Sequence, residues 1–216
     1  MPYRKIEFNT DQVYHICNHG LDDKDIFLDQ DDIQRFLLLL VLFNEEEPSG
    51  GIFELNQPCN QLRHQVSKLV EIVCYCLNPN HFHLLLKQRL DKGIEKFMQK
   101  VGNGYAKYYN NRYKRAGPLF RGPFRAFPVA SNEKLLEISA YINLNNRVHN
   151  LPKDNIWASS WKEFTDVNSS LNLCSKGIVL DQFSDRQEYI NFAEGLLPVF
   201  REAKDDEKEL KLLGLL

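Results

Sequence analysis

The chain has 216 residues, 43% of them hydrophobic and 26% charged, a composition typical of globular proteins rather than of disordered or membrane chains. Its longest apolar stretch, residues 36–43, is shorter than the roughly 18 residues that cross a bilayer. Residues 1–10 contain no apolar segment of the secretory kind. Five cysteines without a Cys-x-x-Cys pair argue against a disulfide framework. We therefore expect a cytoplasmic protein without a membrane partner.

Charge is unevenly distributed along the chain, although the net charge is only −2. Residues 87–125 contain eleven cations and two anions, which leaves a local charge of +9. Acidic residues gather instead in residues 22–32, 45–47 and 181–209. The basic segment is a candidate surface for binding phosphate groups.

Residues 1–90 predict three strands and one helix. Residues 12–17 have the β-branched and aromatic content of a strand, and apolar residues from Ile33 to Val41 recur with helical spacing. Loop-forming residues between positions 45 and 63 indicate an insertion. A continuous apolar strand over residues 70–77 is joined by a tight turn to a second strand over residues 81–87, which makes a hairpin.

The chain after the hairpin predicts two helices, at residues 92–113 and 133–147, with a short edge strand over residues 124–129 between them. Beyond residue 152 we expect irregular structure apart from a helix over residues 185–197. The order of elements predicts an α+β fold with an antiparallel sheet and helices packed mainly on one face. We expect one domain over residues 1–150 and a C-terminal extension over residues 151–216, packed on the domain or following it.

Two histidines, His81 and His83, open the second strand of the hairpin. Alternate side chains of a strand point to one face, so both imidazoles face the same way at a sheet end, where a bound metal would stay open to substrate. Two other interpretations remain open. The histidines could be structural, or they could form a closed zinc site with Cys74 and Cys76, although those cysteines lie in an apolar run typical of a core.

A lysine ridge is predicted on the helix after the hairpin, because Lys92, Lys96 and Lys100 recur every four residues. Such a ridge could follow a phosphate backbone, although a solvated helix face would have the same pattern. Neighbouring tyrosines would suit unstacked bases. The candidate DNA-binding residues are Lys92, Lys96, Lys100, Lys107, Tyr108, Arg112, Arg115, Arg121 and Arg125.

Residues 75–87, YCLNPNHFHLLLK, resemble the His-hydrophobic-His signature of IS200-like single-tyrosine transposases, particularly the REP-associated branch. Matching segments run from Tyr14-His15-Ile16 through the helix containing Tyr141 to residues 157–161. The resemblance covers roughly residues 10–165 and leaves the C-terminal tail weakly matched. The resemblance implies a ferredoxin-like fold. It also implies an enzyme that cleaves and rejoins single-stranded or hairpin DNA through a 5′-phosphotyrosine.

The resemblance also assigns site residues. By motif position it makes Tyr141 the nucleophile and Asn145 the third ligand, beside His81 and His83, of a divalent Mg²⁺ or Mn²⁺ ion. Residues four apart share a helical face, so Tyr141 and Asn145 can both face the histidines. Asn146 departs from the family, which usually has proline there. Nothing in the sequence identifies a base that would activate the tyrosine.

Two functional alternatives also fit the sequence. A domesticated DNA-binding protein would keep the fold and the basic surface but not the reaction. A zinc-stabilised RNA-binding module would use Cys74 and Cys76 with the two histidines, and would unfold when zinc is removed. The sequence is compatible with a monomer or a homodimer.

Overall fold

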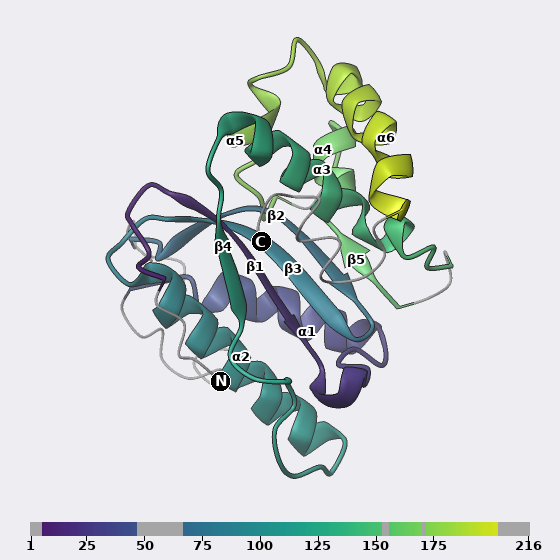
Figure 1. Cartoon of the computed structure of the whole chain (residues 1–216). Helices are drawn as coiled ribbons and strands as arrows, with labels where there is room; N and C mark the ends of the chain where they lie inside the picture. Colours follow the sequence, from purple (N-terminus) through teal and green to yellow (C-terminus); the bar gives the residue numbers. More distant parts are fainter. Residues whose placement is uncertain (1–5, 47–66, 153–155, 170–171, 203–216) are drawn as a thin grey trace.

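The computed structural model describes residues 6–46, 67–152, 156–169 and 172–202, so nearly all of the predicted insertion at 45–63 lies outside the described residues. A five-stranded antiparallel sheet runs through the molecule in the order β4-β1-β3-β2-β5 (Figure 1). The strands are β1 (Val13–His19), β2 (Val70–Asn78), β3 (His81–Gln88), β4 (Arg125–Pro128) and β5 (Ala158–Ser159). The helices are η1 (Leu21–Asp23), α1 (Gln30–Leu42), α2 (Gly93–Arg112), α3 (Asn132–Val148), α4 (Trp161–Thr165), α5 (Gly177–Leu180) and α6 (Arg186–Glu202).

The first four strands and two long helices form a β1-α1-β2-β3-α2-β4 unit. Their strand order, β4-β1-β3-β2, together with α1 and α2 on one face of the sheet, is the ferredoxin-like arrangement (Figure 1). The predicted α+β class, the antiparallel sheet and the ferredoxin-like core are thereby confirmed.

Helices cover both faces of the sheet, which differs from the expectation that they pack mainly on one. Helix α3, with α6 packed against it, lies on the face opposite α1 and α2 (Figure 1). The reason lies in β2 and β3, whose residues are almost all buried on both sides. A strand that is apolar on both faces needs a layer on each to remove it from water.

An aromatic cluster joins α1 and α2 to the sheet. The ring of Phe36 lies 5.1 Å from that of Phe82 on β3 and 5.0 Å from that of Tyr105 on α2. Phe27 packs edge-on against Phe36 at 5.3 Å, and the Tyr105 hydroxyl donates a hydrogen bond to the carbonyl of Ile26. Because Phe82 points to α1 and α2, its neighbours on β3 point to the other face.

The segment after residue 150 completes the sheet. Strand β5, which the sequence did not predict, pairs with β2 at its edge, and the backbone N–H of Tyr75 donates to the Ser160 hydroxyl at 2.9 Å. The chain after residue 150, where we expect the C-terminal extension, therefore adds a strand to the same sheet. Helix α3 is capped at its N-terminus, since Ser131 Oγ accepts a hydrogen bond from the Lys134 N–H.

Two glycines in α2 provide a test of this packing. Position 102 has open space where a Cβ would stand, whereas a Cβ at position 104 would lie 2.6 Å from Phe43 Cε2. Gly102→Ala should raise the free energy of unfolding by about 0.5–1 kcal/mol through helix propensity alone. Gly104→Ala should gain less or lose stability, because the Phe43 ring must move. Urea unfolding of both variants measures the difference, and equal gains would contradict this α1–α2 packing.

Candidate active site

The two predicted histidines lie side by side on the face of β3 that α3 covers. His83 stands opposite Cys17 of β1 and Cys76 of β2, while His81 stands opposite His19 of β1. The two rings are 5.1 Å apart and nearly perpendicular. Both side chains are buried, at 6% and 5% exposure, so water contributes little to their solvation.

The ring of His81 is fixed by asparagine side chains. Its Nδ1 lies 2.7 Å from Asn80 Oδ1, and because that oxygen only accepts hydrogen bonds, Nδ1 carries the proton. The unprotonated Nε2 lies 3.2 Å from Asn145 Oδ1. The Asn78 amide donates to both atoms, at 3.0 and 2.5 Å. Two acceptor atoms thus converge on a single donor, an arrangement in which a cation could replace that donor.

Tyr141 lies between the sheet and the C-terminal helix. Its ring is 5.6 Å from the ring of His83 and 5.4 Å from that of Phe200 on α6. The residue is only 1% exposed. The structure therefore brings His81, His83, Tyr141 and Asn145 together, and it places the tyrosine beneath α6.

Burial keeps these histidines neutral. It lowers the pKa of His81 to about 3, with a further contribution from the nearby His19 and His149. Burial also holds the pKa of His83 well below its usual range, and burial followed by the charge of Arg125 lowers the pKa of His15 to about 3. At neutral pH each imidazole therefore keeps a lone pair, the form in which histidine binds metals.

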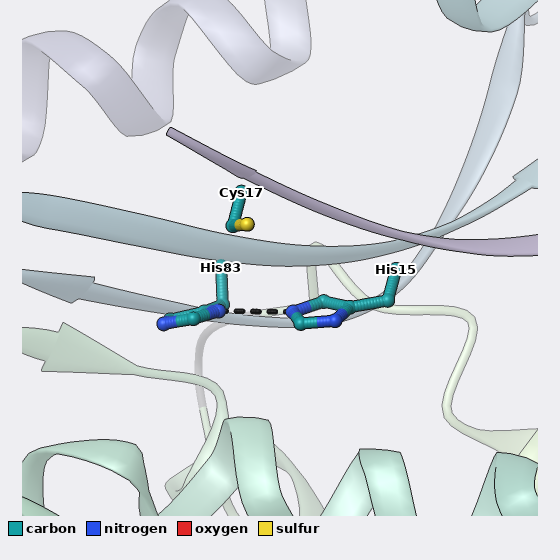
Figure 2. A group of neighbouring side chains, drawn as sticks. All are labelled: His15, Cys17 and His83. Atoms are coloured by element: carbon teal, nitrogen blue, oxygen red, sulfur yellow. Dashed lines mark hydrogen bonds between the residues drawn. The ribbon is translucent and has the colours of Figure 1, made fainter. Parts of the chain in front are cut away.

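A second group of ligand-type side chains shares His83 (Figure 2). The ligand atoms of His15, Cys17 and His83 lie within 4.8 Å of one another, and no other such group of three His, Cys, Asp or Glu residues occurs in the part of the chain that is described. The sequence indicated His15 only as part of a motif that matches the resembled family, and Cys17 only as one of five cysteines. The alternation of β1, which puts both residues on one face, was the signal that could have found them.

The closed-zinc alternative uses Cys74 and Cys76, which lie on the same face of the sheet as the histidines but pack in the core. Cys74 and Cys76 are fully buried. Burial raises the pKa of the Cys76 thiol to about 12 and that of Cys74 well above its usual range. With His81 and His83 they do not form a metal-sized cluster among the described residues. The geometry therefore favours the interpretation that both thiols fill the core.

A pocket of about 440 Å³ opens beside the outer end of the histidine pair. His19, His81 and His149 line it, together with Asp23 and Asn80. The ring of His81 stacks on that of His19 at 4.9 Å and meets that of His149 at 5.1 Å. A small group can therefore approach His81 from solvent without crossing α3. His19 was not predicted as a site residue, because the first strand was expected to end at residue 17.

The predicted lysine ridge lies on the other side of the sheet. Lys92 is the N-cap residue of helix α2, whereas Lys96 and Lys100 lie within the helix. Lys92 and Lys96 are exposed, and Lys100 donates to the Glu45 carbonyl at 3.0 Å. The exposed Lys107 belongs to the same helix. Ridge and histidine pair therefore share no face, and a DNA molecule contacting both would have to pass around a sheet edge.

Several predicted DNA-binding residues already have protein partners. The guanidinium of Arg112 pairs with Asp29, Asp31 and Asp32 and donates to the Tyr108 hydroxyl, so carboxylates of the protein compensate its charge. Arg121 pairs with Asp23, and Arg115 lies over the Tyr109 ring at 5.5 Å.

Arg125 differs from the other predicted cations, because it lies on the histidine face. It stands opposite Cys17 in the β1–β4 pairing, and residues paired directly across an antiparallel ladder point to the same side. Its guanidinium lies over the ring of Phe127 at 5.2 Å. Arg125 is therefore placed to act near the histidines rather than on the ridge.

Two comparisons with known proteins found matches to this chain. Residues 55–145 match a family model. That family is the IS200-like transposases. The structure is also similar to the solved structure of a REP-associated tyrosine transposase bound to a REP hairpin, with a TM-score of 0.51 at 11% sequence identity, covering 76% of this chain and 84% of that chain.

These matches confirm the resemblance to IS200-like transposases, and the structural match supports the fold. The IS200-like match includes His81, His83, Tyr141 and Asn145. No curated protein matches the sequence. Within the described residues, no helix is both long and apolar enough to cross a membrane.

The lowered histidine pKa values predict a loss of stability in acid. Below about pH 6.5 the unfolded chain binds a proton at His81 that the folded protein takes up only near its lowered pKa of about 3. The stability contributed by the neutral ring is therefore present above pH 6.5 and falls as the pH falls. Between about pH 7 and pH 5, the wild type should lose about 2 kcal/mol more than His81→Gln. Urea unfolding at both pH values measures this, and equal losses would contradict the assigned pKa.

Proposed function

We propose that this protein cleaves and rejoins single-stranded or hairpin DNA as a metal-dependent, single-tyrosine enzyme of the IS200-like kind. Tyr141 is the nucleophile, and His81, His83 and Asn145 hold the divalent ion. One observation carries the proposal. The acceptor atoms His81 Nε2 and Asn145 Oδ1 lie 3.2 Å apart in a buried site that also contains the Tyr141 ring.

The residues present fit a divalent ion. Two neutral imidazoles and one amide oxygen suit Mn²⁺ better than Mg²⁺, which prefers oxygen ligands. The Asn145 Nδ2 is buried without a hydrogen-bond partner among the described residues, so the side chain is oriented for its oxygen at an energetic cost. When bound, the ion would act as a Lewis acid that stabilises charge on the scissile phosphate.

The covalent step belongs to Tyr141. Its hydroxyl gives up its proton as the oxygen attacks phosphorus, and the bond to the 3′ oxygen breaks. The leaving oxygen takes up a proton to become a 3′-hydroxyl, so no proton is gained or lost overall. A 5′-phosphotyrosine remains. Because this ester keeps the energy of the broken bond, a DNA hydroxyl can reverse the step and rejoin strands without ATP. A tyrosine of ordinary pKa near 10 is a weak nucleophile at neutral pH, so the site must activate it.

The DNA contacts are divided between two surfaces. Lys92 at the N-terminal cap of α2, and Lys96 and Lys107 on the helix, are exposed. They supply attraction to the phosphate backbone that depends little on sequence. Arg125, on the edge strand β4, orients the strand that enters the site. Arg112 is left out of the proposed interface, because three carboxylates hold its guanidinium.

A second candidate is a DNA-binding protein of the same fold that has lost the reaction. The observation that favours it is the burial of Tyr141 beneath Phe200. A phosphate can reach the Tyr141 hydroxyl only if α6 gives way. The two candidates differ in whether DNA binding displaces α6.

Adduct formation separates the candidates. With single-stranded hairpin oligonucleotides and Mn²⁺, the wild type should form a covalent protein–DNA adduct that survives a denaturing gel. Tyr141→Phe should abolish it, because among the residues that the structure describes no other tyrosine has a ring contact with His83. His81→Ala should reduce its formation more than about 100-fold, since losing a ligand costs more than losing a ligand's partner.

Tyr14→Phe is the matched control, because this tyrosine lies on β1 but on the face of the sheet away from the histidines, and the change should leave adduct formation unchanged. An adduct that persists in Tyr141→Phe would show that the nucleophile is another residue. Tight hairpin binding with no adduct under any condition would favour the non-catalytic candidate.

The two DNA surfaces respond differently to salt. Replacing Lys92 and Lys96 with Ala should lower the slope of log affinity against log salt by about 2, with little change in adduct rate at saturating DNA. Arg125→Ala should lower the slope by at most about 1 and slow adduct formation. Fluorescence anisotropy over a salt series measures the slopes. A double lysine variant with an unchanged slope would remove the ridge from the interface.

A further inference from the structure

His15 is a buried polar residue in the middle of an apolar strand. Its neighbours on β1, Tyr14 and Ile16, are buried hydrophobic residues, and His15 itself is only 1% exposed. It stands opposite Leu85, two residues along β3 from His83. His81, His83 and His15 therefore lie in a row, with His15 at the end away from His81.

The contact between His15 and His83 uses one nitrogen of each ring. His15 Nε2 lies 2.9 Å from His83 Nδ1, and the rings are nearly parallel with centroids 5.1 Å apart. Figure 2 shows the second ring nitrogen of His83 on the side away from His15. Only this Nε2 is left to bind a metal.

One proton lies between the two rings, and its position decides whether His83 can be a ligand. If His15 donates, the neutral His83 carries its proton on Nε2, which blocks metal binding. If His83 Nδ1 donates, its Nε2 keeps a lone pair. A ligating histidine almost always donates its other N–H to a nearby acceptor, which fixes both tautomer and orientation.

We propose that His15 is a positioning residue: it accepts a hydrogen bond from His83 Nδ1 and holds His83 in the tautomer whose Nε2 can bind a metal. The importance of this tautomer for the reaction rests on the proposed function, in which His83 is a ligand. The tautomer itself is a property of the protein without metal.

The surroundings of His15 support a role other than packing. Its Nδ1 is buried without a hydrogen-bond partner in the described part of the chain, and an unpaired buried polar atom costs stability. Aromatic rings of Phe127 and Tyr141 lie 6.0 and 6.4 Å away. A leucine would suit this apolar setting better, so a histidine at this position costs the fold stability.

The test compares His15→Leu, which removes the acceptor, with His15→Gln, whose amide oxygen can replace it. Cys17→Ala is the matched control on the same strand and face. Nitrogen-15 NMR of the metal-free protein reports the His83 tautomer, calorimetry reports the Mn²⁺ affinity, and thermal unfolding reports stability.

In the wild type we expect the His83 proton on Nδ1. His15→Leu should shift the tautomer toward Nε2–H and weaken Mn²⁺ binding by about 10- to 100-fold without lowering Tm. His15→Gln should restore most of the affinity, and Cys17→Ala should resemble the wild type. A purely structural histidine would instead lower Tm and leave the tautomer unchanged.

Two results would overturn the proposal. One is an unchanged His83 tautomer in His15→Leu. The other is a Cys17→Ala variant that loses as much affinity as His15→Leu, which would make His15 and Cys17 ligands of a thiolate-containing metal site. If the wild type binds no Mn²⁺ but His15→Leu still shifts the tautomer, the positioning role stands and the proposed function fails.

Discussion

The antiparallel register of β1, β3 and β2 is the constraint on which the candidate site depends. It sets His15, His83 and His81 in a row on one face of the sheet. A slip of one residue in β3 would turn both of its histidines toward the aromatic cluster of α1 and α2. The short connection between β2 and β3 and the packing of Phe82 against Phe36 oppose such a slip. The same contacts that build the core therefore also aim the histidines.

Helix α3 completes the site from above, and a polar network fixes its position. Asn143 donates to the Tyr189 hydroxyl at 2.9 Å and accepts from Ser160 at 2.6 Å, which ties α3 to α6 and to the sheet edge. Buried hydrogen bonds of this kind hold a helix in one orientation when all partners are satisfied. Tyr141 and Asn145 lie on the same helix, so this network also sets their distance to the histidines. The C-terminal segment thus both positions Tyr141, the proposed nucleophile, and covers it.

Sequence patterns located most elements, because hydrophobic period and turn residues are local signals. The hairpin and the helix containing Tyr141 were predicted close to their observed bounds. Strand β5 was missed because its two residues, Ala158 and Ser159, carry no period. Which face of the sheet a helix covers depends on long-range packing. For this reason the sequence could not place the lysine ridge relative to His81. Motif similarity, rather than spacing, singled out Tyr141 among the tyrosines, while His15 needed the β1–β3 register.

The central claim is that Tyr141 becomes bonded to DNA at the site of the histidine pair. Mass spectrometry of a trypsin digest after reaction with a hairpin oligonucleotide and Mn²⁺ tests it most directly, because residues 135–147 form one tryptic peptide with Tyr141 as its sole tyrosine. We predict that this peptide carries a nucleotide phosphate. A nucleotide phosphate found only on a peptide with another tyrosine would contradict the account.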